Sequence, residues 1–307
     1  MSTLVTGAAG FIGSHVCEAL AARGEEVLGL DEMNDYYPVS LKTHRLSRLR
    51  DLPGFRFVRH ELGAWAMGAG VLRGVDRIIH LAAWAGVRNS TAHPVLYGEA
   101  NIMATLRLFE AARLAGIRSV VYASSSSSKR LASVYGATKR ACEDLADAYG
   151  SLHGMTMTGL RYHTVYGPRG RPDMAMWKFA RAIHAGEAIE VYNNGDMSRD
   201  FSFVSDIVDA TILAHDRKAA PGDVRVFDVG SGRRRKLLDM IHLIEQAMGK
   251  TVERVMLPMQ PGDVESTLAD NGPARAAFGY QPSVDLEAGI PRFVAWYLEH
   301  RAAGGVA

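Results

Sequence analysis

A tyrosine and a lysine four residues apart, Tyr135 and Lys139, are the side chains best suited to acid–base chemistry. The pattern of residues 135–150 is helical, and residues four apart share one face of a helix. A free phenol has a pKa of about 10 and is a poor base at neutral pH. A neighbouring ammonium favours the phenolate, which could then remove a proton from a hydroxyl. The alternative is a solvated surface pair, because the motif is short.

A glycine-rich turn near the start of the chain predicts a dinucleotide site. The apolar residues 3–6 lead into Gly7, Gly10 and Gly13, and the amphipathic stretch 11–23 follows. Gly7 allows a tight turn, Gly10 lets the backbone approach a pyrophosphate, and Gly13 lets the helix pack close to the sheet. The helix N-terminus then offers free N–H groups to the phosphates. This context favours a nucleotide over a turn that binds nothing.

An acid ends the next apolar run, at Asp31. A carboxylate about twenty residues beyond the turn can accept both ribose hydroxyls and would repel a 2′-phosphate. The sequence therefore predicts NAD rather than NADP. When bound, NAD would take up the hydride that accompanies proton removal by Tyr135.

Five serines, at 124–128, follow the apolar run 119–123. One or two of their hydroxyls could hydrogen-bond a reacting oxygen and orient the tyrosine. For at least two of the five, a polar turn is the expected role.

Strand-like and helical patterns alternate through the first half of the chain, which predicts an α/β fold with a Rossmann-type, doubly wound parallel sheet. In such sheets the ligand lies at the carboxyl ends of the strands, where the glycines, Asp31 and the serines fall. The expected strands are 3–6, 27–31, 56–60, 77–82, 119–123 and 157–162, and the expected helices are 11–23, 41–50, 97–115 and 135–150.

Prolines break the second half into shorter pieces. Residues 1–163 are expected to form the NAD-binding domain, to which 198–230 return as a helix (201–215) and a strand (224–229). Residues 164–197 and 231–307 are expected to form a smaller C-terminal substrate-binding lobe over the strand ends.

Composition excludes several function classes. The formal net charge of +2 on 307 residues gives no electrostatic footprint for nucleic acid or a membrane surface. The two cysteines, Cys17 and Cys142, form neither a metal-binding spacing nor a disulfide framework, and no metal is predicted. Apolar runs are strand-sized, and the first strand begins almost at Met1. These features predict a cytoplasmic protein without a membrane partner.

Taken together, the motifs resemble the extended short-chain dehydrogenase/reductase family over essentially the whole chain, in its nucleotide-sugar branch. Four of the motifs, at 164–168, 170–175, 199–201 and 258–264, are most similar to those of UDP-glucuronate 4-epimerases. The motifs are T-G-A-A-G-F-I-G at 6–13, H-L-A-A at 80–83, A-G-V-R at 85–88, S-S-S-S at 124–127, Y-x-x-x-K at 135–139, G-L-R-Y at 159–162, T-V-Y-G-P at 164–168, G-R-P-D-M-A at 170–175, R-D-F at 199–201 and P-M-Q-P-G-D-V at 258–264.

The resemblance implies roles for individual residues. Tyr135 would be the base beside Lys139, with Ser125 and Ser127 near the reacting hydroxyl. NAD would contact these two residues together with Gly7, Gly10, Phe11, Ile12, Gly13, Asp31, Asn34, Leu81, Ala82, Ala83 and Tyr162. The UDP-sugar would contact Arg88, Ser126, Thr164, Arg171, Asn193, Arg199, Gln260 and Asp263, with Thr164 and Arg171 on the hexuronate carboxylate. Structural ion pairs are the alternative for Arg199 and Asp263, and a turn hydrogen bond is the alternative for Gln260.

The sequence departs from the family between the serines and Tyr135, which only seven or eight residues separate. Relatives carry a longer loop there, so a short substrate flap is expected. His163 also replaces an aromatic residue, and Trp84 a smaller polar one.

The implied reaction is NAD-dependent epimerisation at C4 of UDP-glucuronate, giving UDP-galacturonate through a transient 4-keto sugar. The serine cluster offers only hydroxyls, which disfavours the dehydratases and decarboxylases, since these need an acid there. A UDP-glucose or UDP-N-acetylglucosamine 4-epimerase, a UDP-glucuronate decarboxylase and a catalytically silent NAD-binding sensor remain alternatives. The resemblance also implies a homodimer through helices 97–115 and 135–150, with outer faces that include Phe109 and Ala148.

Overall fold

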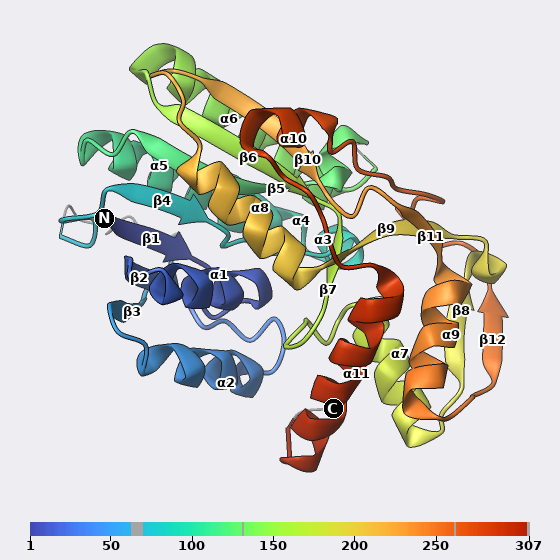
Figure 1. The fold of residues 1–307 in the computed structure, drawn as a ribbon. Coiled ribbons are helices and arrows are strands. Elements are labelled where there is room, and N and C mark those ends of the chain that lie inside the picture. The colour runs from blue at the N-terminus through green and yellow to red at the C-terminus, as the bar shows by residue number, and fades with distance from the viewer. Residues whose placement is uncertain (63–69, 131, 261, 306–307) are drawn as a thin grey trace.

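The computed structural model describes the chain except for residues 63–69, 131, 261 and 306–307. Its centre is a seven-stranded, all-parallel sheet with the order β10-β6-β5-β4-β1-β2-β3 and helices on both faces (Figure 1). The predicted fold class is thus confirmed. The strands are β1 (Ser2–Thr6), β2 (Glu26–Asp31), β3 (Phe55–Arg59), β4 (Arg77–His80), β5 (Ser119–Ser125), β6 (Thr156–Tyr162) and β10 (Val224–Val229).

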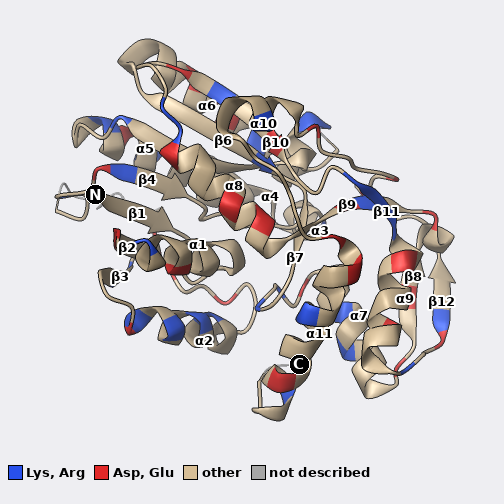
Figure 2. Cartoon of the chain, in the orientation of Figure 1, with Lys and Arg blue, Asp and Glu red and all other residues tan. Residues whose placement is uncertain are grey.

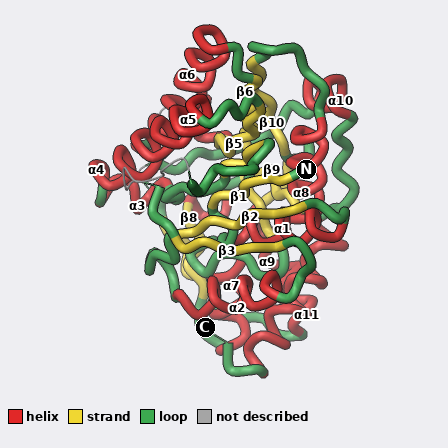
Figure 3. Tube along the Cα trace, turned by 90° about the vertical axis from the view of Figure 1, so that its left-hand side faces the viewer, coloured by secondary structure: helices red, strands yellow, loops and turns green. Residues whose placement is uncertain are grey.

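Both faces of this sheet are covered, so its strands are apolar almost throughout. Successive strand residues point to opposite faces. Val5 packs with the core that contains α1 and α8, and its neighbour Leu4 packs with the core that contains α5 and α6 (Figure 3). The covering helices are α1 (Phe11–Ala22), α2 (Val39–Arg50), α3 (Val87–Ala92), α4 (Pro94–Tyr97), α5 (Ala104–Leu114), α6 (Val134–His153), α8 (Val204–Asp216) and α10 (Gly272–Phe278).

Two small sheets and three further helices lie beyond the carboxyl ends of the central strands (Figure 1). One sheet has the order β11-β9-β7 and the other pairs β12 with β8. Their elements are β7 (Thr164–Tyr166), β8 (Ile189–Tyr192), β9 (Ser198–Phe203), β11 (Arg234–Lys236), β12 (Arg254–Leu257), α7 (Ala175–Ala185), α9 (Leu237–Met248) and α11 (Leu286–Ala302).

The return of the chain to the central sheet differs in part from expectation. Strand β10 joins the sheet beside β6, as predicted. The segment expected as a helix over 201–215 instead begins with the last residues of β9, and α8 starts at Val204. Strand β9 pairs with β7 and β11 rather than with the central sheet. The division into two domains stays a prediction.

The helix expected over 97–115 is interrupted. Residues Gly98–Met103 form a π-helical turn between α4 and α5. An extra residue in such a turn changes which side chains face inward, so Asn101 points into the protein, where it is 1% exposed. Phe109, expected on the outer face, is fully buried among the rings of Tyr122 and Tyr149, so that placement is wrong. The homodimer stays a prediction.

The glycine turn between β1 and α1 is as tight as its sequence indicates. Gly7 has a φ of +73°, which favours glycine. A Cβ on Gly13 would lie 2.0 Å from the carbonyl oxygen of Gly7, and one on Gly10 would lie 2.9 Å from the same atom. These glycines therefore set the spacing between turn and helix.

We expect Gly13→Ala to destabilise the protein by about 1–3 kcal/mol, because the added methyl must displace the turn. The variant should also retain less NAD, since the same backbone would hold the pyrophosphate. Gly98→Ala is the matched control, because no atom lies within 4 Å of a Cβ there. Thermal unfolding and the NAD released on denaturation measure both effects. Normal NAD content and an unchanged Tm in Gly13→Ala would contradict this account.

Candidate active site

A cleft of about 1970 Å³ runs along the carboxyl ends of the central strands. Nearly all residues expected at the site line it, although Gly7 and Asp263 lie toward opposite ends of the chain. The lining includes Gly7, Gly10, Phe11, Ile12, Gly13, Asp31, Asn34, Leu81, Ala82, Ala83, Arg88, Ser125, Ser126, Ser127, Tyr135, Lys139, Tyr162, Thr164, Arg171, Arg199 and Asp263.

Two expected residues are absent from this lining, Asn193 and Gln260. The Asn193 amide donates to the carbonyl oxygen of Asp196 at 2.7 Å and closes its own turn. The backbone carbonyl of Gln260 accepts from the N–H of Asp263 at 3.2 Å, within a turn. Pro261, within the 258–264 motif, and Leu131, in the short loop before α6, lie outside the described residues.

At one end of the cleft, Asp31 closes β2 with a buried carboxylate. Its two oxygens accept from the backbone N–H groups of Ala9 (3.1 Å) and Met33 (2.8 Å). Lys42 on α2, which the sequence analysis did not single out, lies 3.9 Å from the carboxylate and donates to the Asn34 side chain at 2.6 Å. The glycine turn fits the pyrophosphate of NAD, and Asp31 at the end of β2 fits its ribose.

In the middle of the cleft, α6 carries both Tyr135 and Lys139. The ammonium of Lys139 donates to the carbonyl oxygen of Ala123 at 2.8 Å, which fixes it against the end of β5. The Tyr135 ring packs edge-on against Tyr97, with 6.3 Å between the centroids. No described side chain is hydrogen-bonded to the Tyr135 hydroxyl, so it is available to a ligand in the cleft.

The π-helical turn anchors α6. The Asn101 amide accepts from the backbone N–H of Trp84 at 2.8 Å and donates to its carbonyl at 2.9 Å. It also donates to the hydroxyl of Thr138 at 3.0 Å, and this hydroxyl donates to the carbonyl of Tyr135. Sequence periodicity could not reveal Asn101, because a regular helix would turn the residue elsewhere.

The serine turn divides into supporting and cleft-facing residues. Ser124 and Ser128 donate to the same oxygen of Glu143 on α6, at 2.5 and 2.7 Å. Arg161 on β6 holds both Glu143 oxygens with a fork of 2.8 and 2.6 Å. Burial would raise the pKa of Glu143, but Arg161 and the two hydroxyls hold it below its ordinary value. Ser125, Ser126 and Ser127 line the cleft, and Ser124 lines it too while it supports the turn.

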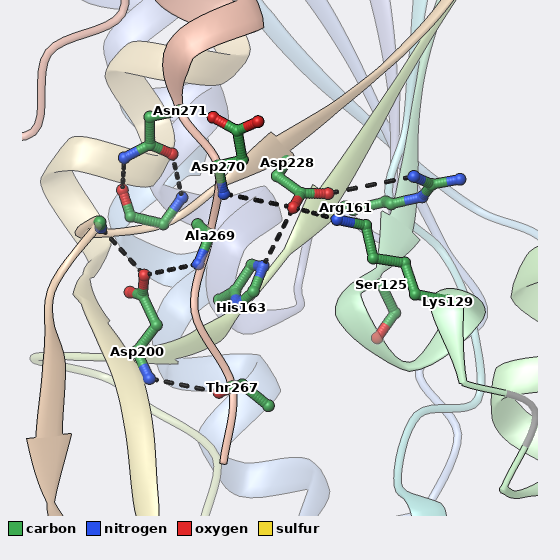
Figure 4. Close-up of polar contacts among 12 residues, drawn as sticks. Ser125, Lys129, Arg161, His163, Asp200, Asp228, Thr267, Ala269, Asp270 and Asn271 are labelled. Atoms are coloured by element: carbon green, nitrogen blue, oxygen red, sulfur yellow. Dashed lines mark hydrogen bonds and ion pairs between the residues drawn. The ribbon is translucent and has the colours of Figure 1, made fainter.

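A second buried carboxylate, Asp228, lies on the other side of this turn (Figure 4). It accepts from the ammonium of Lys129 and from the backbone N–H of Asp270 (3.3 Å), with His163 at 3.8 Å. Burial acts to raise the pKa of Asp228, but the nearby His163 ring and the ammonium of Lys129 lower it to about 2. The ion pair ties the short loop before α6 to β10.

Behind Asp228, Asp200 organises the segments that return to the cleft (Figure 4). It is fully buried and accepts from the backbone N–H groups of Ser231 (2.6 Å), Gly232 (2.9 Å) and Ala269 (3.1 Å). Its own N–H donates to Thr267 at 3.2 Å. Residues 266–268 are thereby held along the cleft wall.

Two of the expected cations that line the cleft already have carboxylate partners. Arg171 makes a fork with Asp173 at 3.0 and 2.5 Å, and its pKa is raised by that carboxylate against the effect of burial. Arg88 pairs with Asp263 at 2.9 Å and stacks on the ring of Tyr192. A ligand anion at Arg171 or Arg88 must therefore share or exchange these contacts.

Tyr162 lines the cleft beside these groups but points its hydroxyl away. Its OH is 2.8 Å from the hydroxyl of Thr211 on α8, and burial raises its pKa. It can contribute ring surface to the cleft rather than a proton.

The comparisons with known proteins agree with this geometry. Residues 3–230 match the model of the NAD dependent epimerase/dehydratase family. The chain belongs to this family. It is 41% identical to the uncharacterised protein MJ1055 of Methanocaldococcus jannaschii, with 97% of this chain and 96% of that protein covered.

Two characterised members of the family are also close. UDP-glucuronate 4-epimerase 2 of Arabidopsis thaliana is 38% identical, with 99% of this chain and 77% of that protein covered. The crystal structure of UDP-glucuronic acid 4-epimerase from Bacillus cereus, in complex with UDP-glucuronic acid and NAD, superposes with a TM-score of 0.92 at 31% identity. It covers 97% of this chain and 99% of the other.

These matches confirm three predictions made from the sequence: the extended short-chain dehydrogenase/reductase family, the NAD cofactor, and an NAD-dependent nucleotide-sugar 4-epimerase as the enzyme class. The roles of individual site residues stay predictions. No described helix of this family member is long and apolar enough to cross a membrane.

The lowered pKa of Asp228 gives a pH-dependent prediction. The pKa of Asp228 is lower in the folded protein than its ordinary value of 3.8, so the ionised carboxylate stabilises the fold at pH values above 3.8. This stabilisation is lost as the pH falls through the folded-state pKa of about 2. Asp228→Asn should therefore cost about 2 kcal/mol at pH 7 and progressively less in acid. Urea unfolding of both proteins at several pH values between 3 and 7 measures this. A difference independent of pH would contradict it.

Proposed function

We propose that this protein interconverts UDP-glucuronate and UDP-galacturonate by epimerisation at C4. The observation that carries the proposal is Arg171, a guanidinium on the wall of the cleft that also holds Tyr135, Lys139 and the serine hydroxyls. A guanidinium fork matches a carboxylate geometrically. A site for a sugar acid therefore lies in the same cleft as the proton-transfer groups.

The proton-transfer roles follow from the contacts of α6. Lys139 is fixed at the end of β5, and its positive charge favours the phenolate of Tyr135. Tyr135 would take the proton of the 4-hydroxyl and later return it, with Ser125 and Ser127 hydrogen-bonded near the reacting oxygen. NAD, when bound, accepts the hydride from C4 and returns it to the opposite face after the 4-keto sugar has turned.

Elimination and decarboxylation are disfavoured by the surroundings of the serine turn. An acid that served these reactions would have to reach the sugar beside Tyr135. The nearest carboxylate to the serines, Glu143, lies beneath them and is occupied by Arg161, Ser124 and Ser128. It supports the turn instead of facing the substrate.

A uronate substrate brings a hazard that Arg171 can control. A ketone at C4 makes the C5 carboxylate part of a β-keto acid, which loses carbon dioxide readily. Holding the carboxylate by the Arg171 fork, with Thr164 nearby, would keep its bond to C5 from aligning with the ketone π-system.

Proton NMR of UDP-glucuronate with purified protein and no added cofactor tests the proposal directly. We expect UDP-galacturonate to appear, because NAD is regenerated in each turnover and should remain bound. Conversion of UDP-glucose or UDP-N-acetylglucosamine alone would overturn the acidic-sugar assignment, and a pentose product would indicate a decarboxylase. Tyr135→Phe should abolish turnover while keeping NAD, whereas a silent NAD-binding sensor would show no turnover in either protein.

The carboxylate assignment predicts the behaviour of Arg171→Ala. Loss of a charged fork should reduce kcat/KM for UDP-glucuronate on the order of 10²-fold, or release pentose product as the carboxylate becomes free to rotate. Arg140→Ala is the control, because Arg140 is half-exposed on α6 and pairs only with Asp144. An unchanged rate with clean product in Arg171→Ala would remove Arg171 from the substrate site.

A further inference from the structure

Arg45 on α2 is the most deeply buried cation of the described residues, and no carboxylate pairs with it. It is 0% exposed, and burial lowers its pKa. Its charge is met by oxygens of other kinds: three backbone carbonyls and the hydroxyl of Tyr37. A lone buried charge is costly unless its hydrogen bonds are satisfied. This arrangement therefore depends on the positions of those oxygens.

The oxygens that Arg45 binds belong to two segments that are far apart in sequence but adjacent in space. It donates at 3.2 Å to the carbonyl of Ala9, within the glycine turn. It also donates to the carbonyls of Arg169 (3.0 and 2.8 Å) and Gly170 (2.8 Å), the two residues directly before Arg171. One planar guanidinium thus joins the dinucleotide turn to the backbone that carries Arg171.

This backbone needs external support. Arg169 has a φ of +61°, a left-handed conformation that side chains other than glycine rarely adopt. Its guanidinium is held from the other side by Glu18 on α1, with both contacts at 2.6 Å. The 169–170 segment is thereby clamped between α1 and α2, and Figure 2 marks the basic positions along α2 in blue.

The charges around Arg171 leave room for one more anion. Three guanidiniums, those of Arg45, Arg169 and Arg171, gather beside two carboxylates, those of Glu18 and Asp173. Arg48 also contacts Glu18, so positive charges outnumber the carboxylates in this cluster. A sugar carboxylate in the cleft would reduce that excess.

We propose that Arg45 is a positioning residue that sets the place of Arg171 relative to the glycine turn, and so gives the site its preference for an acidic sugar. The inference rests on the proposed function, in which Arg171 binds the carboxylate. Arg45 touches neither ligand in this account. It acts through the carbonyls of residues 169 and 170.

Binding measurements in the inactive Tyr135→Phe background test this proposal. The quantities are the dissociation constants of UDP-glucuronate, UDP-glucose and UDP, together with NAD content and Tm. We expect Arg45→Met to raise the dissociation constant of UDP-glucuronate at least tenfold and to change that of UDP by less than twofold. Arg45→Lys should recover part of the loss, because an ammonium can still donate to some of the carbonyls.

Arg50→Met is the matched control, since Arg50 lies on the same helix, is exposed and has no hydrogen bond or ion pair with the described residues around Arg45. It should leave all three dissociation constants unchanged. If Arg45→Met does not fold, Tyr37→Phe removes one of the oxygens bound by Arg45 without removing its charge. That variant should show a smaller loss confined to UDP-glucuronate.

Arg171→Ala in the same background separates this proposal from the one on which it rests. If Arg171→Ala keeps the preference for UDP-glucuronate over UDP-glucose, the proposed carboxylate site fails. If Arg171→Ala loses the preference while Arg45→Met and Tyr37→Phe keep it, only the positioning role of Arg45 fails. An equal loss of UDP and UDP-glucuronate affinity in the foldable variants would show a structural role alone and would also overturn the inference.

Discussion

The buried carboxylate of Glu143 joins three elements that border the cleft: α6, the serine turn after β5, and β6. It projects from α6, which holds Tyr135 and Lys139, and accepts from the serine turn after β5 and from Arg161 on β6. A buried ion pair whose remaining lone pairs are satisfied tolerates little displacement, and removal of one partner typically costs about 3–5 kcal/mol. The contacts of Glu143 therefore fix the distance between α6 and the serine turn. The cleft-facing serines are positioned by Glu143 and Arg161, which do not line the cleft.

The arginines that line the cleft differ from Glu143 in how they are paired. Arg171 and Arg88 have internal carboxylate partners, Asp173 and Asp263. A ligand that binds them exchanges one charged contact for another, so the net gain in affinity is small. The discrimination against a neutral ligand is larger, because a neutral group cannot replace the carboxylate that it displaces. Such a site favours discrimination between charged and neutral ligands over high affinity.

The cleft is built at the edge where chain segments distant in sequence meet. Asp200 holds the loops near Ser231 and Ala269, Asp228 holds Lys129, and Arg45 holds the segment before Arg171. Each of these residues is a buried charge with partners from two or more elements. They supply the rigidity that irregular loops lack, and they explain how a short connection before α6 can remain in place.

The sequence by itself determined the chain order of the central-sheet strands, the glycine turn, Asp31 and the Tyr135–Lys139 pair. These features depend on local periodicity and on spacing within one strand–turn–helix unit. Only the tertiary structure decided that residues 98–103 form a π-helical turn, that Phe109 is buried, and that Ser124 and Ser128 support the turn while the three serines between them face the cleft. Lys42, Asn101, Glu143 and Arg45 also emerged only there. An apolar pattern records which face of an element is buried, but the partner of a buried polar group comes from another element, which for Arg45 lies more than 120 residues along the chain.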